Sequence, residues 1–278
     1  MPAPEFVSLS PHHQAFVDRF VLVCSADDRV VAAFLGGSNA TGKADEYSDL
    51  DLCVITKDDS FAEFYDQRES FLRSLGDLVF LEDFGTPNIA LYIFADGTEG
   101  ELNFGSEGHL DQIHSGSFHS LVDKNNILAG AMFPERTPDA AKQAEKLRGN
   151  IFVFWHELSH FITAIGRGHL WWAHGQLDAL RSICVNLMRL ENNFSDEGVG
   201  NEPYFKLEYA LSVEKLAPLQ STFCPLDKRA MLQSVQWIVS IYLQTAKSLA
   251  ESHGIAYPHK LERVMLERLA KLSGRAVG

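Results

Sequence analysis

The two halves of this chain follow different patterns, and that change limits the fold more than any other feature of the sequence. Up to about residue 125, short apolar runs alternate with segments of helical spacing. From about Pro138 onward, long stretches of helical periodicity are interrupted by glycine, proline and polar residues. The sequence therefore predicts two parts, one built around a sheet and one built from helices alone.

The first part is expected to hold a mixed sheet with flanking helices. Ser10 and Pro11 form an N-cap and first-turn pair, and Phe16, Phe20 and Val23 follow at helical spacing. A second helix is expected over residues 61–75. Strands are expected over residues 30–35, 49–56, 79–81, 89–95 and 101–104.

The second part reads as an all-helical bundle. Helices are expected over residues 139–165, 169–193, 203–217, 227–252 and 259–273. With 278 residues, the chain has room for two domains. We place them at residues 1–135 and 136–278, joined at residues 134–138, and the expected fold class is α+β.

Charge is concentrated in the first part of the chain. Residues 1–125 carry 22 acids and 7 bases, a net charge of −15, whereas residues 126–278 carry a net charge of +2. An acidic half opposes binding to duplex nucleic acid, which requires a surface of Lys and Arg. It favours metal cations or a cationic small substrate. A solvated acidic surface without a ligand would have the same composition, so charge alone does not decide between them.

The location of the protein is also constrained by the sequence. No apolar run approaches the roughly 18–20 residues that span a bilayer, and the N-terminus lacks the pattern of a secretory signal. The four cysteines form no CxxC pair, which suits reduced thiols. We expect a cytoplasmic protein with no membrane partner; a homodimer is left open.

One constellation of residues points to phosphate chemistry. Gly37 and Ser38 follow an apolar strand, so backbone N–H groups and a hydroxyl are free to meet a phosphate. Asp49 and Asp51 stand two apart on the next expected strand, so both side chains point to one face. Carboxylates arranged in this way bind Mg²⁺ together with substrate phosphates. Glu101, which opens another expected strand, offers a third carboxylate to the same face.

This combination resembles the signature of the DNA polymerase β-like nucleotidyltransferase superfamily, and in particular the two-domain lincosamide and aminoglycoside nucleotidyltransferases. The likeness covers most of the chain. It includes the segments at residues 36–51, 96–107, 123–125 and 167–168.

The resemblance implies a role for each residue of the constellation. Gly37 and Ser38 would hold the nucleotide phosphates, Asp49 and Asp51 would bind Mg²⁺, and Glu101 would act as a metal ligand or as the base. Some antibiotic-modifying relatives carry a lysine three places after the serine. Thr41 stands there in this chain, and Lys43 is the nearest base that could contact the nucleotide.

The implied activity is Mg²⁺-dependent transfer of a nucleoside monophosphate to a hydroxyl group of a small molecule. The co-substrate would be ATP or another nucleoside triphosphate, and the acceptor a lincosamide or an aminoglycoside. The alternative is a protein of the same fold that modifies or regulates a protein partner. The complete set of three acids favours an enzyme over a degenerate binding protein.

A second motif competes with this interpretation. His156, Glu157 and His160 form the HExxH pattern of zinc peptidases, in which two histidines share a helix face. The extended form of that motif needs a glycine and a histidine where Thr163 and Gly166 stand. We therefore expect no stoichiometric zinc. The two histidines are interpreted as lining a cleft between domains or satisfying a hydrogen bond in the core.

Other residues of the helical part are left open by the sequence. Arg167 and His174 would share a face if their helix began as early as Arg167, an arrangement similar to a pair in helix-bundle RNases. Trp155, Trp171 and Trp172 are core or interface residues in one interpretation, and stack on a sugar-bearing acceptor in the other.

Overall fold

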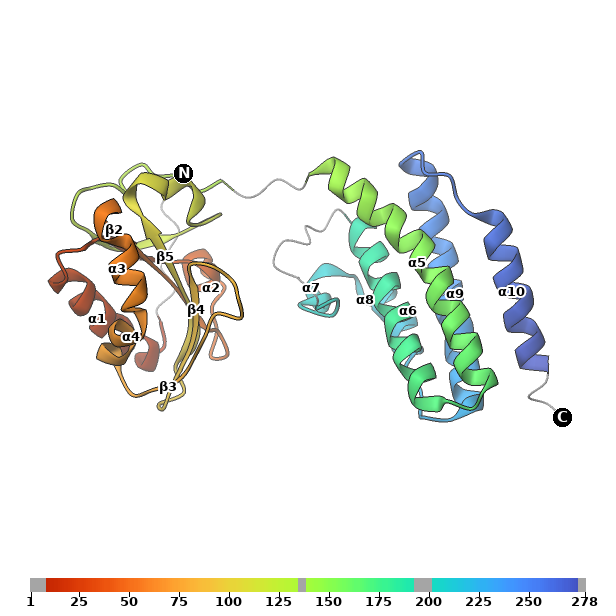
Figure 1. Cartoon of the computed structure of the whole chain (residues 1–278). Helices are drawn as coiled ribbons and strands as arrows, with labels where there is room; N and C mark the ends of the chain where they lie inside the picture. The colour runs from red at the N-terminus through yellow and green to blue at the C-terminus, as the bar shows by residue number, and fades with distance from the viewer. Residues whose placement is uncertain (1–8, 135–138, 193–201, 275–278) are drawn as a thin grey trace. The chain divides into compact units, whose positions relative to one another are not determined.

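In the computed structural model, which describes residues 9–134, 139–192 and 202–274, six strands of the N-terminal part form one mixed sheet (Figure 1). Their order is β3-β4-β5-β2-β1-β6. Strands β2 and β5 are parallel, and the other neighbouring pairs are antiparallel. The strands are β1 (Val30–Leu35), β2 (Leu50–Thr56), β3 (Leu78–Glu82), β4 (Ile89–Phe94), β5 (Glu99–Ser106) and β6 (His119–Asp123).

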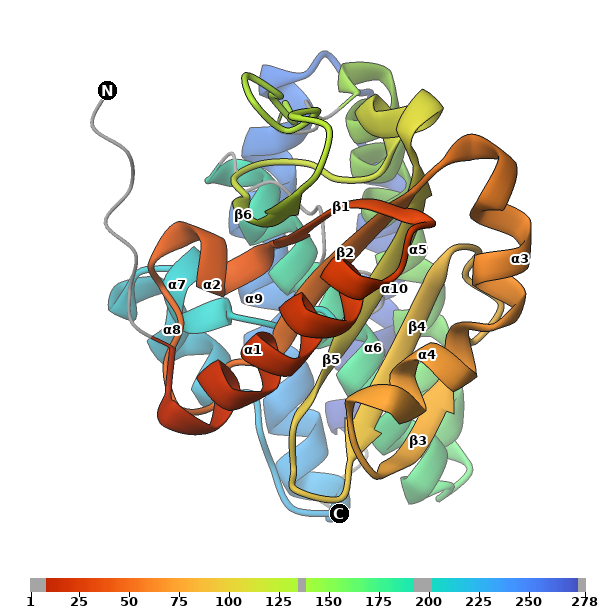
Figure 2. The same cartoon turned by 90° about the vertical axis from the view of Figure 1, so that its left-hand side faces the viewer.

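Three helices cover one face of this sheet, as Figure 2 shows: α1 (Pro11–Ala26), α3 (Phe61–Asp66) and α4 (Arg68–Leu75). The expected start of α1 is confirmed, because Pro11 stands in its first turn and the Ser10 hydroxyl accepts a hydrogen bond from His13 N. Aromatic residues from all three helices pack against the sheet, among them Phe16, Phe64 and Phe71. The face of the sheet on which they pack is therefore closed to substrate.

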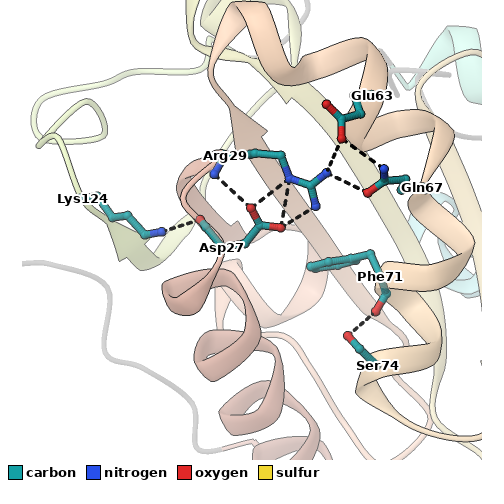
Figure 3. A network of polar contacts seen from close by, with 7 residues as sticks. All are labelled: Asp27, Arg29, Glu63, Gln67, Phe71, Ser74 and Lys124. Carbon is teal, nitrogen blue, oxygen red and sulfur yellow. Dashed lines mark hydrogen bonds and ion pairs between the residues drawn. The ribbon is translucent and has the colours of Figure 1, made fainter.

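The expected single helix over residues 61–75 is interrupted at Gln67, which lies between α3 and α4. A polar network holds this break, as Figure 3 shows. The guanidinium of Arg29 donates to Gln67 Oε1 at 2.8 Å and pairs with Asp27 at 2.7 Å. Lys124 Nζ donates to the carbonyl oxygen of Asp27 at 2.7 Å. The network ties the end of α1 to β1, to the α3–α4 break and to the residue after β6.

On the opposite face of the sheet, the described residues of the N-terminal unit form a core over β1 and β2. Residues between 110 and 133, including Phe118, Leu128 and Phe133, pack there in a second small core. On β4, the side chains alternate between buried and partly exposed positions. Those of Ile89, Leu91 and Ile93 point away from the α1 side and are partly exposed. This open part of the sheet borders the acidic residues described below.

The C-terminal part is helical, and four long helices dominate it. Helix α5 contacts α6 and α10, and α6 also contacts α9. They share a core in which the rings of Phe154 and Tyr242 stack 3.6 Å apart, with Trp155 against Tyr242. The helices are α5 (Ala140–Gly166), α6 (Leu170–Glu191), α7 (Leu207–Ala210), α8 (Val213–Gln220), α9 (Lys228–Ser252) and α10 (His259–Gly274).

The chain divides into two compact units, Met1–Arg136 and Thr137–Gly278, called here the N-terminal unit and the helical unit. The α+β class, with a sheet in the first part and helices in the second, is confirmed. Residues 135–138, part of the expected junction, lie outside the described residues. Among the helices described, none is long and apolar enough to cross a membrane.

One further expectation about the elements is wrong, and one strand of the structure was not expected. The helix expected over residues 203–217 is instead the short pair α7 and α8, because Lys206 adopts a left-handed conformation and Leu211 an extended one. The edge strand β6 was not expected, since it pairs with β1 only and its burial does not alternate cleanly.

Candidate active site

The turn after β1 brings the backbone directly against an acidic side chain. The strand ends at Leu35, and residues Gly37–Thr41 form the short helix α2 where an open turn was expected. Gly36 N donates to the carbonyl oxygen of Asp51 at 2.8 Å. Gly37 has φ of +55°, and a Cβ atom there would lie 1.7 Å from Asp51 Oδ2. Only glycine permits this conformation and this approach together.

Two buried polar atoms in the same turn have no hydrogen-bond partner among the described residues, Ser38 Oγ and Asn39 Oδ1. The other end of the Asn39 amide is engaged, because Nδ2 donates to the carbonyl oxygen of Asp49 at 2.8 Å. Buried polar atoms in native proteins are nearly always paired. The Ser38 hydroxyl is thus a free donor at the point where a phosphate oxygen is expected.

The three acids lie at the end of the sheet where the parallel strands β2 and β5 begin. Asp51 and Glu101 are direct neighbours in the β2–β5 register, and Asp49 immediately precedes β2. Strand β5 begins at Glu99, so Glu101 is its third residue and not its first, as had been expected. A pocket of about 220 Å³ is lined by Asp49, Phe80, Leu91, Tyr92, Ile93, Glu99, Gly100 and Glu101.

Burial and a neighbouring charge act on Glu101. Partial burial raises the pKa of its carboxyl above the ordinary value of 4.5, and the nearby charge of Asp49 raises the pKa further. A carboxylate with a raised pKa holds a transferred proton more readily than a solvated one. A pKa raised above the ordinary carboxyl value is one property of carboxylates that act as general bases.

The donor atoms fit a hard divalent cation but do not form a closed cage. Carboxylate oxygens are the ligands that Mg²⁺ prefers, and the ion usually keeps water or substrate phosphates as its other ligands. The oxygens of Asp49, Asp51 and Glu101 do not all lie within 4.8 Å of one another. The acids therefore suit a metal that arrives with a nucleotide, rather than a resident ion enclosed by protein ligands.

Lys43 is not brought to this cluster by a contact of its side chain. It is exposed, one residue beyond the left-handed Gly42 that ends α2. Its backbone N–H donates to Ser38 O at 3.0 Å. In the described part of the chain, no hydrogen bond or ion pair of its ammonium group is present. Its expected contact with the nucleotide stays a prediction.

Two residues that support the site were missed in the sequence. Asn39 holds the backbone of Asp49, and Tyr92 donates its hydroxyl hydrogen to the carbonyl oxygen of Leu50 at 2.8 Å, between the two aspartates. Tyr92 is 1% exposed. The polar residue directly after Gly-Gly-Ser was a usable signal for Asn39. The partner of a buried tyrosine hydroxyl depends on strand register, which the sequence does not specify.

A larger hollow lies elsewhere in the N-terminal unit and offers no comparable chemistry. It measures about 500 Å³, and it is lined by Leu22, Val23, Ala26, Asp27, Asp28 and Ser74. The Arg29 guanidinium hydrogen-bonds Asp27 and lowers the pKa of that carboxyl. Asp27 is thus committed to the network in Figure 3.

The remaining candidates belong to the helical unit. His156 and His160 are exposed to solvent on α5, so their interpretation as partners of a core hydrogen bond is wrong, and their interpretation as lining a cleft between domains stays a prediction. Helix α6 begins at Leu170, so Arg167 precedes it and does not share a helical face with His174. Trp155 is buried in the core, whereas Trp171 is 82% exposed and Trp172 is 38% exposed. The question of stacking on an acceptor stays open for the last two.

Comparison with known proteins identifies a family for most of the chain. The model of a family described as streptomycin adenylyltransferase matches residues 12–272. A crystal structure of an aminoglycoside 6-adenyltransferase from Bacillus subtilis is similar over 94% of this chain and 97% of that chain, with 14% sequence identity and a TM-score of 0.45. A search of curated proteins finds no match. The family match spans both units, and the chain belongs to the streptomycin adenylyltransferase family of nucleotidyltransferases.

Proposed function

We propose that this enzyme transfers AMP from ATP to a hydroxyl group of an aminoglycoside, in a reaction that depends on Mg²⁺. The observation that carries the proposal is the register of β2 and β5, which sets Asp51 beside Glu101. Asp49 lies at the same edge, and its charge acts on the Glu101 carboxyl. The streptomycin adenylyltransferase family supports both the nucleotide and the class of acceptor.

Asp49 and Asp51 would hold the metal, and the turn at residues 36–39 would hold the triphosphate. The Ser38 hydroxyl, buried and without a partner among the described residues, is a suitable donor to a phosphate oxygen. The contact between Gly37 and Asp51 keeps the phosphate-binding turn and the metal-binding carboxylate in a fixed relation. When bound, Mg²⁺ supplies charge neutralisation for the phosphate oxygens.

Glu101 would act as the base. The acceptor oxygen attacks the α-phosphorus, and its proton passes to the Glu101 carboxylate. A bond forms between that oxygen and phosphorus, the bond from the α-phosphorus to the bridging oxygen breaks, and pyrophosphate leaves. Glu101 comes from a different strand than the aspartates. It can therefore contact the acceptor hydroxyl while the aspartates bind the metal and the nucleotide.

The lining of the pocket beside Glu101 supports a cationic acceptor. Its charged residues are Asp49, Glu99 and Glu101, and among the residues that the structure describes no Lys or Arg lines it. Phe80, Leu91 and Ile93 add apolar surface on which a sugar ring can pack. A polyamine sugar matches this combination better than a lincosamide does, because it carries more positive charge to pair with the acids.

A panel of acceptors tests the proposal. Purified enzyme with ATP and Mg²⁺ is expected to release pyrophosphate with streptomycin-type or other aminoglycosides, and to add the mass of AMP to the product. Lincosamides should be poor acceptors. Asp51→Asn should abolish the release without loss of the folded state, since it removes a metal ligand and some repulsion between carboxylates. An AMP-sized mass increase on a cellular protein, with no turnover of small molecules, would instead support the protein-modifying alternative.

A further inference from the structure

A group of metal-ligating side chains lies in the helical unit and takes no part in the reaction proposed above. It consists of His156, Glu157 and His160, all on α5. We propose that these three residues form a binding site for a divalent transition-metal ion of the zinc class. In the part of the chain that the structure describes, this is the one group of three in which every ligand atom lies within 4.8 Å of the others.

The geometry follows from the helix. Positions i and i+4 lie one above the other on a helical face, and the rings of His156 and His160 are 4.3 Å apart between centroids. Glu157 Oε1 lies 3.0 Å from His156 Nδ1, and Glu157 Oε2 lies 3.9 Å from His160 Nδ1. Ligands of tetrahedral zinc, each about 2.0–2.2 Å from the ion, are about 3.4 Å apart. The three donor atoms already lie within 4.8 Å of one another.

A neighbouring helix orients the carboxylate. When the side-chain amide of Gln176, on α6, is oriented with its nitrogen toward Glu157, that nitrogen donates to Glu157 Oε2 at 2.5 Å and to the Glu157 carbonyl oxygen at 3.3 Å. Partners of this kind fix the direction of a metal ligand and raise affinity. Glu157 has a side-chain exposure of 20%, whereas the histidines are open to solvent at 64% and 43%. An ion can therefore reach the two histidines from solution, and the Glu157 carboxylate is already oriented toward them.

The donor set determines the kind of ion. Two imidazole nitrogens and one carboxylate oxygen suit zinc, which takes the same set in sites that keep a coordination position open. Mg²⁺ prefers oxygen ligands and does not compete for imidazole. The sequence argued against zinc because no third histidine follows at the spacing of the extended motif. The structure removes that objection, since Glu157 itself lies within reach of both histidines.

Metal titration of the full-length protein tests the site. The protein is freed of its affinity tag and of metal, kept in millimolar Mg²⁺ to occupy the aspartates, and titrated with zinc against a chromophoric chelator. One zinc ion per chain is expected. His156→Ala and His160→Ala should each lower the affinity by more than about tenfold, since losing even an outer partner of a ligand costs about 10–100-fold. His174→Ala is the matched control, because His174 is an exposed histidine on α6 and outside the group.

Cobalt provides a second readout that does not depend on activity. Co²⁺ at this site should give visible absorption bands of nitrogen and oxygen coordination, which disappear in His160→Ala and persist in His174→Ala. Glu157→Gln, which keeps the size of the side chain, should weaken binding without a loss of helix. The proposal is overturned by the absence of saturable zinc binding, or by full zinc affinity in both His156→Ala and His160→Ala.

Discussion

Glu101 has a more buried environment than its acidic neighbour Asp49. It is partly buried and lies beside Leu91 of β4 and Asp51 of β2 in the strand register. Asp49 is exposed before the start of β2. In the mechanism proposed above, proton transfer and metal binding fall to carboxylates in different surroundings, and a substitution at Glu101 should separate the two functions.

Glu101→Gln should damage the chemical step more than nucleotide binding. Loss of a general base lowers the rate by about 10²–10⁴-fold, whereas Asp49, Asp51 and the glycine turn remain to bind the Mg–nucleotide complex. Single-turnover rates and calorimetry with a non-hydrolysable ATP analogue measure the two effects. Glu82→Gln, at an exposed site on β3, is the control and should keep both. If affinity falls together with the rate, Glu101 is chiefly a metal ligand.

The raised pKa of Glu101 predicts a specific pH dependence in metal-free protein. Burial and the charge of Asp49 favour the protonated carboxyl in the folded state. Its protonation therefore stabilises the fold at low pH, and this contribution is lost as pH rises through the raised pKa. An NMR titration of labelled glutamate should give a midpoint above 4.5 for Glu101 and a lower one in Asp49→Asn. An equal or higher midpoint in the variant would show that Asp49 does not act on Glu101.

At the scale of elements, the start of α2 directly after β1 leaves no space for a side chain at Gly37. Gly37→Ala should place a methyl group onto the Asp51 carboxylate, because the ideal Cβ position is 1.7 Å from Oδ2. We expect loss of nucleotide binding and of activity, with a destabilisation of about 1–3 kcal/mol from backbone strain and overpacking. Calorimetry and urea unfolding measure these effects.

Gly130→Ala is the matched control for that substitution. Gly130 also has a positive φ, of +78°, but no atom lies within 4 Å of its Cβ position. The variant shares the backbone strain and lacks the clash, so it should lose stability and keep nucleotide binding. Equal loss of binding in both variants would show that strain, and not displacement of Asp51, is responsible.

The sequence predicted those elements whose signal is local. An apolar run predicted the buried strand β1, the alternation of polar and apolar residues predicted β2, and Ser10 with Pro11 predicted the start of α1. The signals failed where a tertiary contact decides the outcome. Arg29 reaches across to Gln67 at the break between α3 and α4, and β6 is formed only by pairing with β1.

The same distinction applies to the candidate site. Spacing along the chain was enough to select Asp49, Asp51 and Glu101, because alternation on strands places side chains on a chosen face. Tyr92 and Asn39 act through backbone carbonyls of β2 and of the residue before it. Such contacts depend on register and on the path of a turn, so residue type alone does not reveal them.

At the scale of the whole molecule, the two units have separate cores. One cluster of buried residues belongs to the sheet and its helices, and another belongs to α5, α6, α9 and neighbouring helical residues. We expect fragments 1–136 and 137–278 each to unfold cooperatively when prepared alone. Fragment 1–136 should bind the Mg–ATP analogue but transfer no AMP to an acceptor. Circular dichroism during thermal unfolding, with calorimetry, measures this; a fragment without a cooperative transition would contradict it.

The parallel pairing of β2 with β5 has a consequence for biosynthesis. Asp51 and Glu101 are fifty residues apart in the chain, yet they are neighbours in the sheet. Pairing of distant strands is slow compared with the local contacts of helices. The chemistry therefore depends on one of the slower events of folding, and the helical unit can mature earlier although it is synthesised later. In a newly made chain, Asp51 and Glu101 become neighbours only when these two distant strands have paired.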